Sequence, residues 1–147
     1  MTNAYQVYTA ARQLLEGYAA AMQPLCRREG LAPNGVDILL FLANNPGLDT
    51  ARDVCTYRGL KPGIVSFHVE KLVQEGYLER RAVAGDRRKT QLLCTEKAQP
   101  VIARGREVQE RFFARLLHNT DAATREAFFH TMEVIGKNLD EILKENG

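Results

Sequence analysis

Residues 61–95, KPGIVSFHVEKLVQEGYLERRAVAGDRRKTQLLCT, decide the fold of this 147-residue chain. Lys61-Pro62 is typical of a helix start, because proline is favoured at the first helical position. The apolar residues that follow recur at steps of four and three, which places them on one buried helical face: Val65, Val69 and Leu72. Gly76 stands where a glycine commonly ends a helix. The first half of the stretch therefore predicts a helix with one buried side.

The second half of the stretch predicts a hairpin. Residues 77–83 and 89–95 have the pattern of two strands, joined by residues 84–88 with a glycine in the connection. Basic side chains concentrate here, against only Glu79 and Asp86: Arg80, Arg81, Arg87, Arg88 and Lys89. We expect this hairpin to protrude as a wing. If Arg88 lies at its tip, the Asp86 carboxylate would orient the Arg88 guanidinium through a charge-assisted hydrogen bond.

A short helix is expected just before the helix that starts at Lys61. Thr50, followed three residues later by Asp53, predicts a capped helix start, and Gly59 predicts the end of that helix. Two short helices separated by a tight glycine turn form a helix-turn-helix pattern. Upstream, a nearly all-apolar helix is expected to begin at Pro33 and to end at the breaker of residues 45–47, which makes it a buried element.

Long helices are predicted at both ends of the chain. Asn3 with Gln6 resembles a capping box for the first helix, and Pro24 is expected to kink or end that helix because proline lacks the backbone N–H. Beyond Thr95, which is a good N-cap, a fifth helix is expected, with weakened first turns at Pro100 and Gly105. A final helix begins near residues 120–121.

The final helix carries a seam of apolar residues. They alternate at steps of four and three, which is the spacing of a coiled-coil interface: Phe128, Met132, Ile135, Leu139 and Ile142. Together with Val7 and Leu14 of the first helix, we expect this seam to form a homodimer interface. The expected fold is mainly α (α+β), a winged helix-turn-helix with long terminal dimerisation helices. Its parts are a dimerisation helix in residues 1–30, the winged helix-turn-helix domain in 31–95 and dimerisation helices in 96–147.

Composition excludes several classes of protein. A hydrophobic content of 45% and a charged content of 26% fit a globular domain. No apolar run approaches the roughly 18 residues of a membrane span, and the N-terminus lacks the features of a signal peptide, so a cytoplasmic location is expected. The net charge of +2 is too small to identify a nucleic-acid partner, so the local cluster of basic residues matters more than the sum.

Nothing in the sequence predicts an enzyme, a metal or a cofactor. The histidines are scattered, and no cysteine, histidine or carboxylate arrangement has ligand or triad spacing: His68, His118 and His130. Three widely separated cysteines argue against a disulfide framework, and Cys55 and Cys94 fit small buried residues. Cys26 is the exception, because Arg27 and Arg28 beside it would lower the thiol pKa and favour a redox switch.

The combination of a helix-turn-helix and a basic hairpin suits DNA better than a merely solvated surface. A helix can enter the roughly 12 Å wide major groove, and an arginine on a hairpin can reach a narrow minor groove. Gly63 permits close backbone approach, Ser66 can donate to a phosphate or base edge, and Lys61 and Lys71 suit phosphates. The expected DNA-binding residues are Lys61, Gly63, Ser66, Phe67, Lys71, Arg81, Asp86, Arg87, Arg88 and Lys89.

Two aromatic residues of this helix have competing interpretations. Phe67 faces outward, where it could contact a thymine methyl group, although partial cover by the hairpin explains it equally well. His68 rotates toward the buried side, which favours a packed core histidine over a base reader.

Residues 31–98 resemble the MarR family of bacterial regulators, and the flanking helices match that family's layout. The specific segments are residues 76–81 (GYLERR), 86–89 (DRRK) and 95–97 (TEK). The resemblance implies interlocked terminal helices in a dimer, an Asp-x-Arg arginine in the minor groove and repression that small ligands often relieve. By position that arginine is Arg88, with Asp86 as its partner. Phe67, Cys94 and Ala98 stand where the family commonly has a polar or basic residue, a leucine and a glycine, and no inducer is implied.

The sequence therefore predicts a regulator, most readily a repressor, that binds a pseudopalindromic DNA operator as a homodimer, with a small-molecule effector as a further possible partner. Two alternatives stay open. The near-neutral charge and Phe67 also fit a winged-helix protein-interaction module without DNA binding. Cys26 also fits a thiol-based switch.

Overall fold

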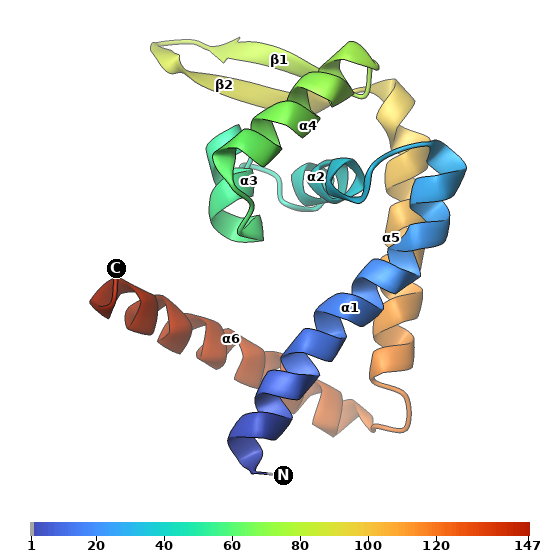
Figure 1. Cartoon of the computed structure of the whole chain (residues 1–147), viewed down its shortest axis with the longest axis vertical. Helices are drawn as coiled ribbons and strands as arrows, with labels where there is room; N and C mark the ends of the chain where they lie inside the picture. The colour runs from blue at the N-terminus through green and yellow to red at the C-terminus, as the bar shows by residue number, and fades with distance from the viewer. Residues whose placement is uncertain (1) are drawn as a thin grey trace. The chain divides into compact units, whose positions relative to one another are not determined.

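The computed structural model describes residues 2–147, which form six α-helices, one short 3-10 helix and one two-stranded sheet (Figure 1). In chain order the elements are α1 (Asn3–Glu29), α2 (Pro33–Asn44), α3 (Ala51–Arg58), α4 (Pro62–Gln74), β1 (Leu78–Val83), β2 (Asp86–Cys94), η1 (Glu96–Ala98), α5 (Gln99–Leu116) and α6 (Ala122–Glu145). This order confirms the predicted winged helix-turn-helix with long terminal helices. The chain divides into two compact units, Met1–Phe112 and Phe113–Gly147.

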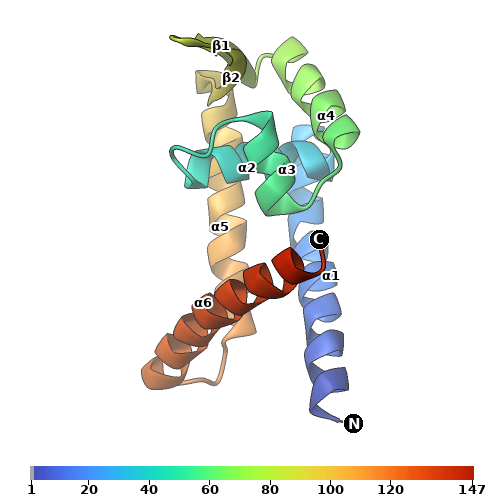
Figure 2. The ribbon, with the colours of Figure 1, turned by 90° about the vertical axis from the view of Figure 1, so that its left-hand side faces the viewer.

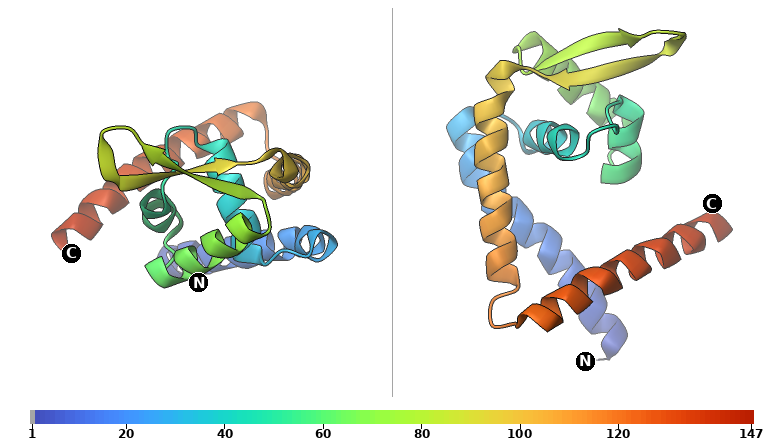
Figure 3. Two further views of the ribbon diagram at one scale, coloured as in Figure 1. Left: turned by 90° about the horizontal axis from the view of Figure 1, so that it is seen from above. Right: turned by 180° about the vertical axis from the view of Figure 1, so that it is seen from behind.

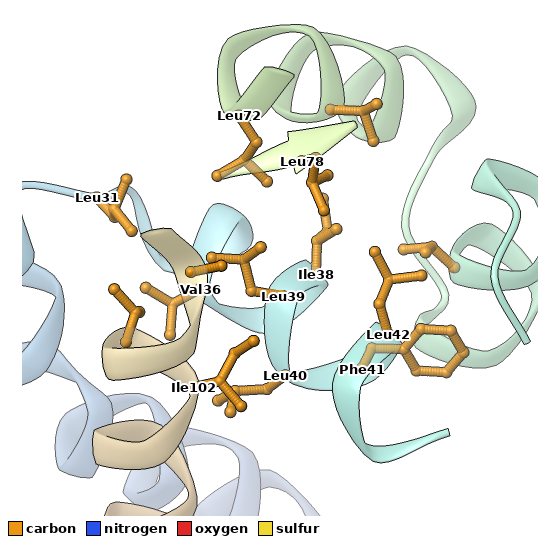
Figure 4. Close-up of a cluster of buried hydrophobic side chains, with 14 of the residues drawn as sticks. Leu31, Val36, Ile38, Leu39, Leu40, Phe41, Leu42, Leu72, Leu78 and Ile102 are labelled. Carbon is orange, nitrogen blue, oxygen red and sulfur yellow. The ribbon is translucent and has the colours of Figure 1, made fainter. Parts of the chain in front are cut away.

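Helix α2 is the centre of the first unit. It contacts α1, α3, α4 and β2 (Figure 2). Its apolar sequence follows from that position, because four consecutive or nearly consecutive side chains are almost fully buried: Val36, Ile38, Leu39 and Leu40. Residues from α4, β1 and α5 close the core around them, among them Leu72, Leu78 and Ile102 (Figure 4). Every buried side chain among residues 2–147 is apolar.

Helix α1 corrects two predictions. Of the two outcomes predicted for Pro24, an end of the helix is wrong: α1 continues to Glu29, because the next turn buries Leu25 and Cys26 in the core. Pro24 itself is exposed, so water can satisfy the carbonyl group that the missing N–H leaves unpaired. The predicted capping box is also wrong, since Asn3 lies inside the helix and no side chain caps its start.

The predicted start and stop signals of the other helices are mostly confirmed. Thr50 and Asp53 form a reciprocal capping box at the start of α3, and Gly59 ends that helix in the left-handed conformation, with φ 65°. Asp121 caps α6 by accepting from the Thr124 N–H at 2.8 Å. Gly105, expected to weaken α5, lies mid-helix against Leu40, where a Cβ would come within 2.7 Å of a Leu40 methyl carbon. The glycine therefore allows α5 to pack closely on α2.

Candidate nucleic-acid interface

Helix α4 and the hairpin lie beside each other at the same end of the first unit (Figure 3). The sequence-predicted residues of α4 and its N-cap are all exposed: Lys61, Gly63, Ser66, Phe67 and Lys71. The opposite side of the helix is buried through Val65, Val69 and Leu72, with exposures of 0%, 3% and 2%. His68 is half-buried, and burial, followed by the positive charge of Lys71, lowers its pKa. A neutral, packed His68 fits the interpretation preferred from the sequence.

Gly63 is open on its surface side. A Cβ added there would have no atom within 4 Å, and its φ is not in the left-handed region. The fold therefore does not require a glycine at this position. The space above its backbone is available to a molecule that approaches α4 closely.

The residues of the predicted TEK segment hold the end of α4. The Thr95 hydroxyl donates to the Gly76 carbonyl at 2.6 Å, and the Lys97 ammonium donates to the Glu75 carbonyl. Lys97 also lies over the Tyr77 ring, 4.5 Å from its centroid. A cation at the C-terminus of a helix interacts favourably with the helix dipole. These contacts fix α4 relative to the end of β2.

Two ion pairs that the sequence did not predict brace the same region. Arg58 donates twice to the Asp37 carboxylate, at 2.8 and 2.9 Å, which joins α3 to α2 and raises the pKa of Arg58. Arg80 of β1 donates to Glu70 of α4 at 2.7 Å, and this hydrogen bond lowers the pKa of Glu70. No local sequence signal identifies either pair, because the partners are 21 and 10 residues apart on different elements.

The hairpin corrects the predicted strand boundaries. Strand β2 begins at Asp86 rather than at Lys89, and the connection is only Ala84-Gly85, with Gly85 at φ 84°. The base of the hairpin is tied to the loop before α3, where the Asp49 carbonyl accepts from the Leu92 N–H at 2.7 Å. Arg88 therefore lies near the tip but in a strand, and not in a long flexible loop.

The register places the basic residues in an irregularity of the hairpin. Ala82 pairs with Thr90, whereas the next residue, Val83, pairs with Asp86. Three residues of β2 therefore have no partner on β1 in this register: Arg87, Arg88 and Lys89. Bulges of this kind redirect side chains away from the ladder. The three basic residues, here called the basic bulge, are all exposed, as is Arg81.

Asp86 has a different role from the predicted one. Its carboxylate accepts from the backbone N–H of Arg88 at 3.0 Å, and not from the guanidinium. Because Arg88 lacks a partner on β1, this bond satisfies an N–H that the ladder leaves unpaired. Within residues 2–147 the Arg88 side chain forms no ion pair. Asp86 thus shapes the backbone of the basic bulge and leaves the guanidinium available.

The two remaining groups of predicted site residues lie on separate elements. On α1, Val7 is 71% exposed and Leu14 is half-buried. On α6, the predicted seam residues are all exposed, between 36% for Phe128 and 52% for Ile142. None of the residues of α6 is buried within the single chain.

The structure opposes the hypothesis of a reactive Cys26. Its side chain is buried in the core, and burial raises the pKa of the thiol, whereas a thiolate switch needs the pKa lowered. Arg27 and Arg28 are exposed and do not offset this burial. In the described part of the chain, no group of three or more His, Cys, Asp or Glu residues could hold a metal ion.

We expect Cys26 in the folded protein to react slowly with iodoacetamide at pH 7. Labelling should accelerate on unfolding in denaturant, when the thiol loses its burial and its pKa returns toward the ordinary value. Mass spectrometry of labelled peptides over time measures the rate, with unfolded protein as the control. Rapid labelling of Cys26 in the folded protein would restore the thiol-switch alternative.

Comparison with known proteins shows what the chain is similar to. A model of the MarR family matches residues 29–89, which span α2 to the basic bulge. Over these residues the chain is similar to the MarR family. It is also similar to the HTH-type transcriptional regulator BilQ of Clostridium symbiosum (strain WAL-14163), with 22% identity over 114 residues and 78% of each chain covered.

Solved structures share the fold of this chain over nearly its whole length. A MarR transcriptional regulator from Methanosarcina mazei Go1 matches with a TM-score of 0.80 and 20% identity, covering 94% of this chain and 99% of that one. CouR from Rhodococcus jostii RHA1, solved bound to p-coumaroyl-CoA, matches with a TM-score of 0.71 and 17% identity, covering 90% of each chain. The matched family model and the relative BilQ both point to regulation of transcription. No helix of residues 2–147 has the length and apolar character needed to cross a membrane.

Proposed function

We propose that this regulator binds a pseudopalindromic DNA operator as a homodimer and represses transcription by occluding the site. The observation that carries the proposal is the placement of an exposed helix α4 and an exposed, unpaired basic bulge beside each other. A helix fills the major groove, and an arginine next to it can reach the adjacent minor groove. In a family of transcriptional regulators, DNA is the partner that both features suit.

The proposed DNA contacts divide into three kinds. The major groove is contacted by three residues of α4: Gly63, Ser66 and Phe67. The Arg88 side chain enters the minor groove, and the hydrogen bond from the Arg88 N–H to Asp86 fixes the backbone that carries it. The other basic residues would contact phosphates and supply affinity and salt dependence: Lys61, Lys71, Arg81, Arg87 and Lys89.

The proposed dimer uses the apolar seam of α6, together with α1. Five apolar side chains lie at coiled-coil spacing on a helix that is exposed throughout, and burying them against another apolar surface would be favourable. A second copy of the chain provides such a surface, because it carries the same seam. The seam residues are Phe128, Met132, Ile135, Leu139 and Ile142. Val7 and Leu14 of α1 would complete the interface. In functional terms we divide the chain into dimerisation segments 1–30 and 96–147 around a DNA-binding segment 31–95.

A small-molecule effector and a cytoplasmic location belong to the same proposal. CouR is solved with p-coumaroyl-CoA bound, which supports ligand control in a protein of this fold. The location follows from the proposed partner, because a bacterial-type regulator meets its operator in the cytoplasm.

In vitro selection from random duplexes tests the proposed function. We expect the purified chain to enrich one pseudopalindrome with half-sites about one helical turn, or about 10 base pairs, apart, because operator symmetry must match protein symmetry. Footprinting on genomic DNA should protect sites with the same pattern. Failure to enrich any sequence would instead favour the winged-helix module that contacts proteins and not DNA.

A further inference from the structure

Four residues form the centre of the exposed face of α4. Residues at positions i, i+4, i+7 and i+11 share a helical face, and the set that lies opposite the buried side is Gly63, Phe67, Glu70 and Gln74. All four are exposed. They are the residues of α4 best directed to reach base edges if the helix enters a groove.

The two polar members of this set are engaged with each other and with the wing. Glu70 accepts from Arg80 of β1 at 2.7 Å and from Gln74 at 3.2 Å. The Arg80 charge compensates that of Glu70, and the hydrogen bond lowers the pKa of Glu70. Glu70 is therefore held to β1, and Gln74 is held to Glu70 through one of its amide N–H groups, so a base contact by Glu70 would compete with these hydrogen bonds.

Phe67 is the remaining side chain of the set, since Gly63 has none. It is 64% exposed, so most of its surface is open to solvent and any cover by the hairpin is partial. Its ring meets the His68 ring edge-on, with centroids 5.1 Å apart and planes at 88°. Ile64, 42% exposed, adds an apolar side chain near the start of the helix. The first two turns of α4 thus present an apolar surface, here called the Phe67 patch, which consists of Ile64 and Phe67.

Basic residues lie on both sides of the Phe67 patch along α4 and on the neighbouring hairpin. Lys61 precedes it and Lys71 follows it on α4, and the basic bulge lies on the adjacent hairpin. An apolar patch framed by positive charge complements a polyanion that exposes apolar groups between its charges. The major groove of DNA has one such group, the 5-methyl group of thymine.

From this surface we infer that α4 reads thymine methyl groups through Phe67, so that each operator half-site requires a thymine opposite this residue. The inference rests on the proposed DNA-binding function and adds the chemical group that is read. Phe67 provides apolar contact to the methyl group, while Ser66 and Lys71 on the flanks hold the neighbouring backbone. Specificity at this position then comes from a methyl group and not from a hydrogen bond.

Deoxyuridine substitution tests the inference, since uracil keeps every hydrogen-bonding group of thymine and lacks only its methyl group. In the duplex selected by the wild-type protein, symmetric pairs of thymines are replaced by deoxyuridine, one pair at a time. We expect one pair at which affinity falls about four-fold per methyl group, or about fifteen-fold for the dimer, as burial of a methylene-sized group implies. In Phe67→Ala, the thymine and uracil duplexes should bind equally well at that pair.

Lys71→Gln is the matched control on the same helix. It should weaken binding to both duplexes alike and leave the thymine-to-uracil ratio unchanged, because a phosphate contact does not sense the methyl group. Equal wild-type affinity for thymine and uracil duplexes at every pair, or an unchanged ratio in Phe67→Ala, would overturn the inference alone. Absence of any DNA binding at low salt would overturn the proposed function with it. A change in the oligomeric state of DNA-free Phe67→Ala would assign the patch to a protein contact and overturn the inference.

Discussion

Replacement of Arg88 by alanine should weaken binding to the selected operator about ten- to a hundred-fold at physiological salt. Arg88 lies in the basic bulge, where its guanidinium has no ion-pair partner within residues 2–147, so its charge is available to the minor groove. The folded state should lose less than about 0.5 kcal/mol, because the side chain is exposed. Fluorescence anisotropy with a labelled duplex measures the affinity, and thermal unfolding checks the fold.

Two substitutions of Asp86 separate the role seen in the structure from the role predicted from the sequence. Asp86→Asn keeps an oxygen that can accept from the Arg88 N–H, whereas Asp86→Ala removes it. The structure predicts that Asp86→Asn retains most of the affinity and Asp86→Ala loses several-fold. Equal losses in both variants would show that the carboxylate charge acts on the guanidinium after all.

For Arg88→Ala, an affinity equal to that of the wild-type protein would mean that the wing does not take part in DNA binding.

Shortening the chain after Gly136 should abolish the dimer. The deletion removes Leu139 and Ile142 from the seam of α6, and a seam reduced to three residues cannot bury enough apolar surface for a stable interface. The core of the first unit should survive, since no residue of α6 is buried in the single chain. Sedimentation velocity at micromolar concentration measures the oligomeric state, and circular dichroism monitors the remaining helices.

A substitution in the full-length chain controls for effects of the truncation other than the loss of the seam. Leu139→Asp places a charge in the seam and should also yield monomers, whereas Lys137→Ala, outside the seam on the same helix, should leave the dimer intact. Stable dimers of both the truncated chain and Leu139→Asp would mean that the apolar seam of α6 is not the interface. Monomers should also bind the operator more weakly, because each half-site would be bound separately.

The order of elements could be predicted because its signals are local. Thr50 with Asp53, Gly59 and Asp121 act on their own backbone within a few residues, and each was placed correctly. The fold class was confirmed for the same reason, since apolar periodicity reports which side of a helix is buried. The exposed face of α4 follows directly from the burial of Val65, Val69 and Leu72.

What sequence reasoning missed depends on tertiary contacts. Pro24 did not end α1 because burial of the following turn outweighs the lost hydrogen bond. The prediction of a reactive Cys26 was wrong because the sequence shows the neighbouring arginines but not the burial that raises the pKa of the thiol. The role of Asp86 was missed because it depends on the shift in register between two strands, which leaves Arg88 without a partner on β1. The Glu70–Arg80 pair, which leaves Phe67 as the side chain of its face without a hydrogen bond, crosses from helix to strand.

The salt dependence of DNA binding tests the central claim most directly. The account predicts that affinity for the selected operator falls steeply between about 50 and 200 mM salt, by roughly a thousand-fold or more if the dimer neutralises six or more phosphates. Lys61, Lys71, Arg81, Arg87 and Lys89 of each protomer supply those charges. An absence of binding even at the lowest salt concentration would contradict the account and leave a winged-helix module that acts through other partners.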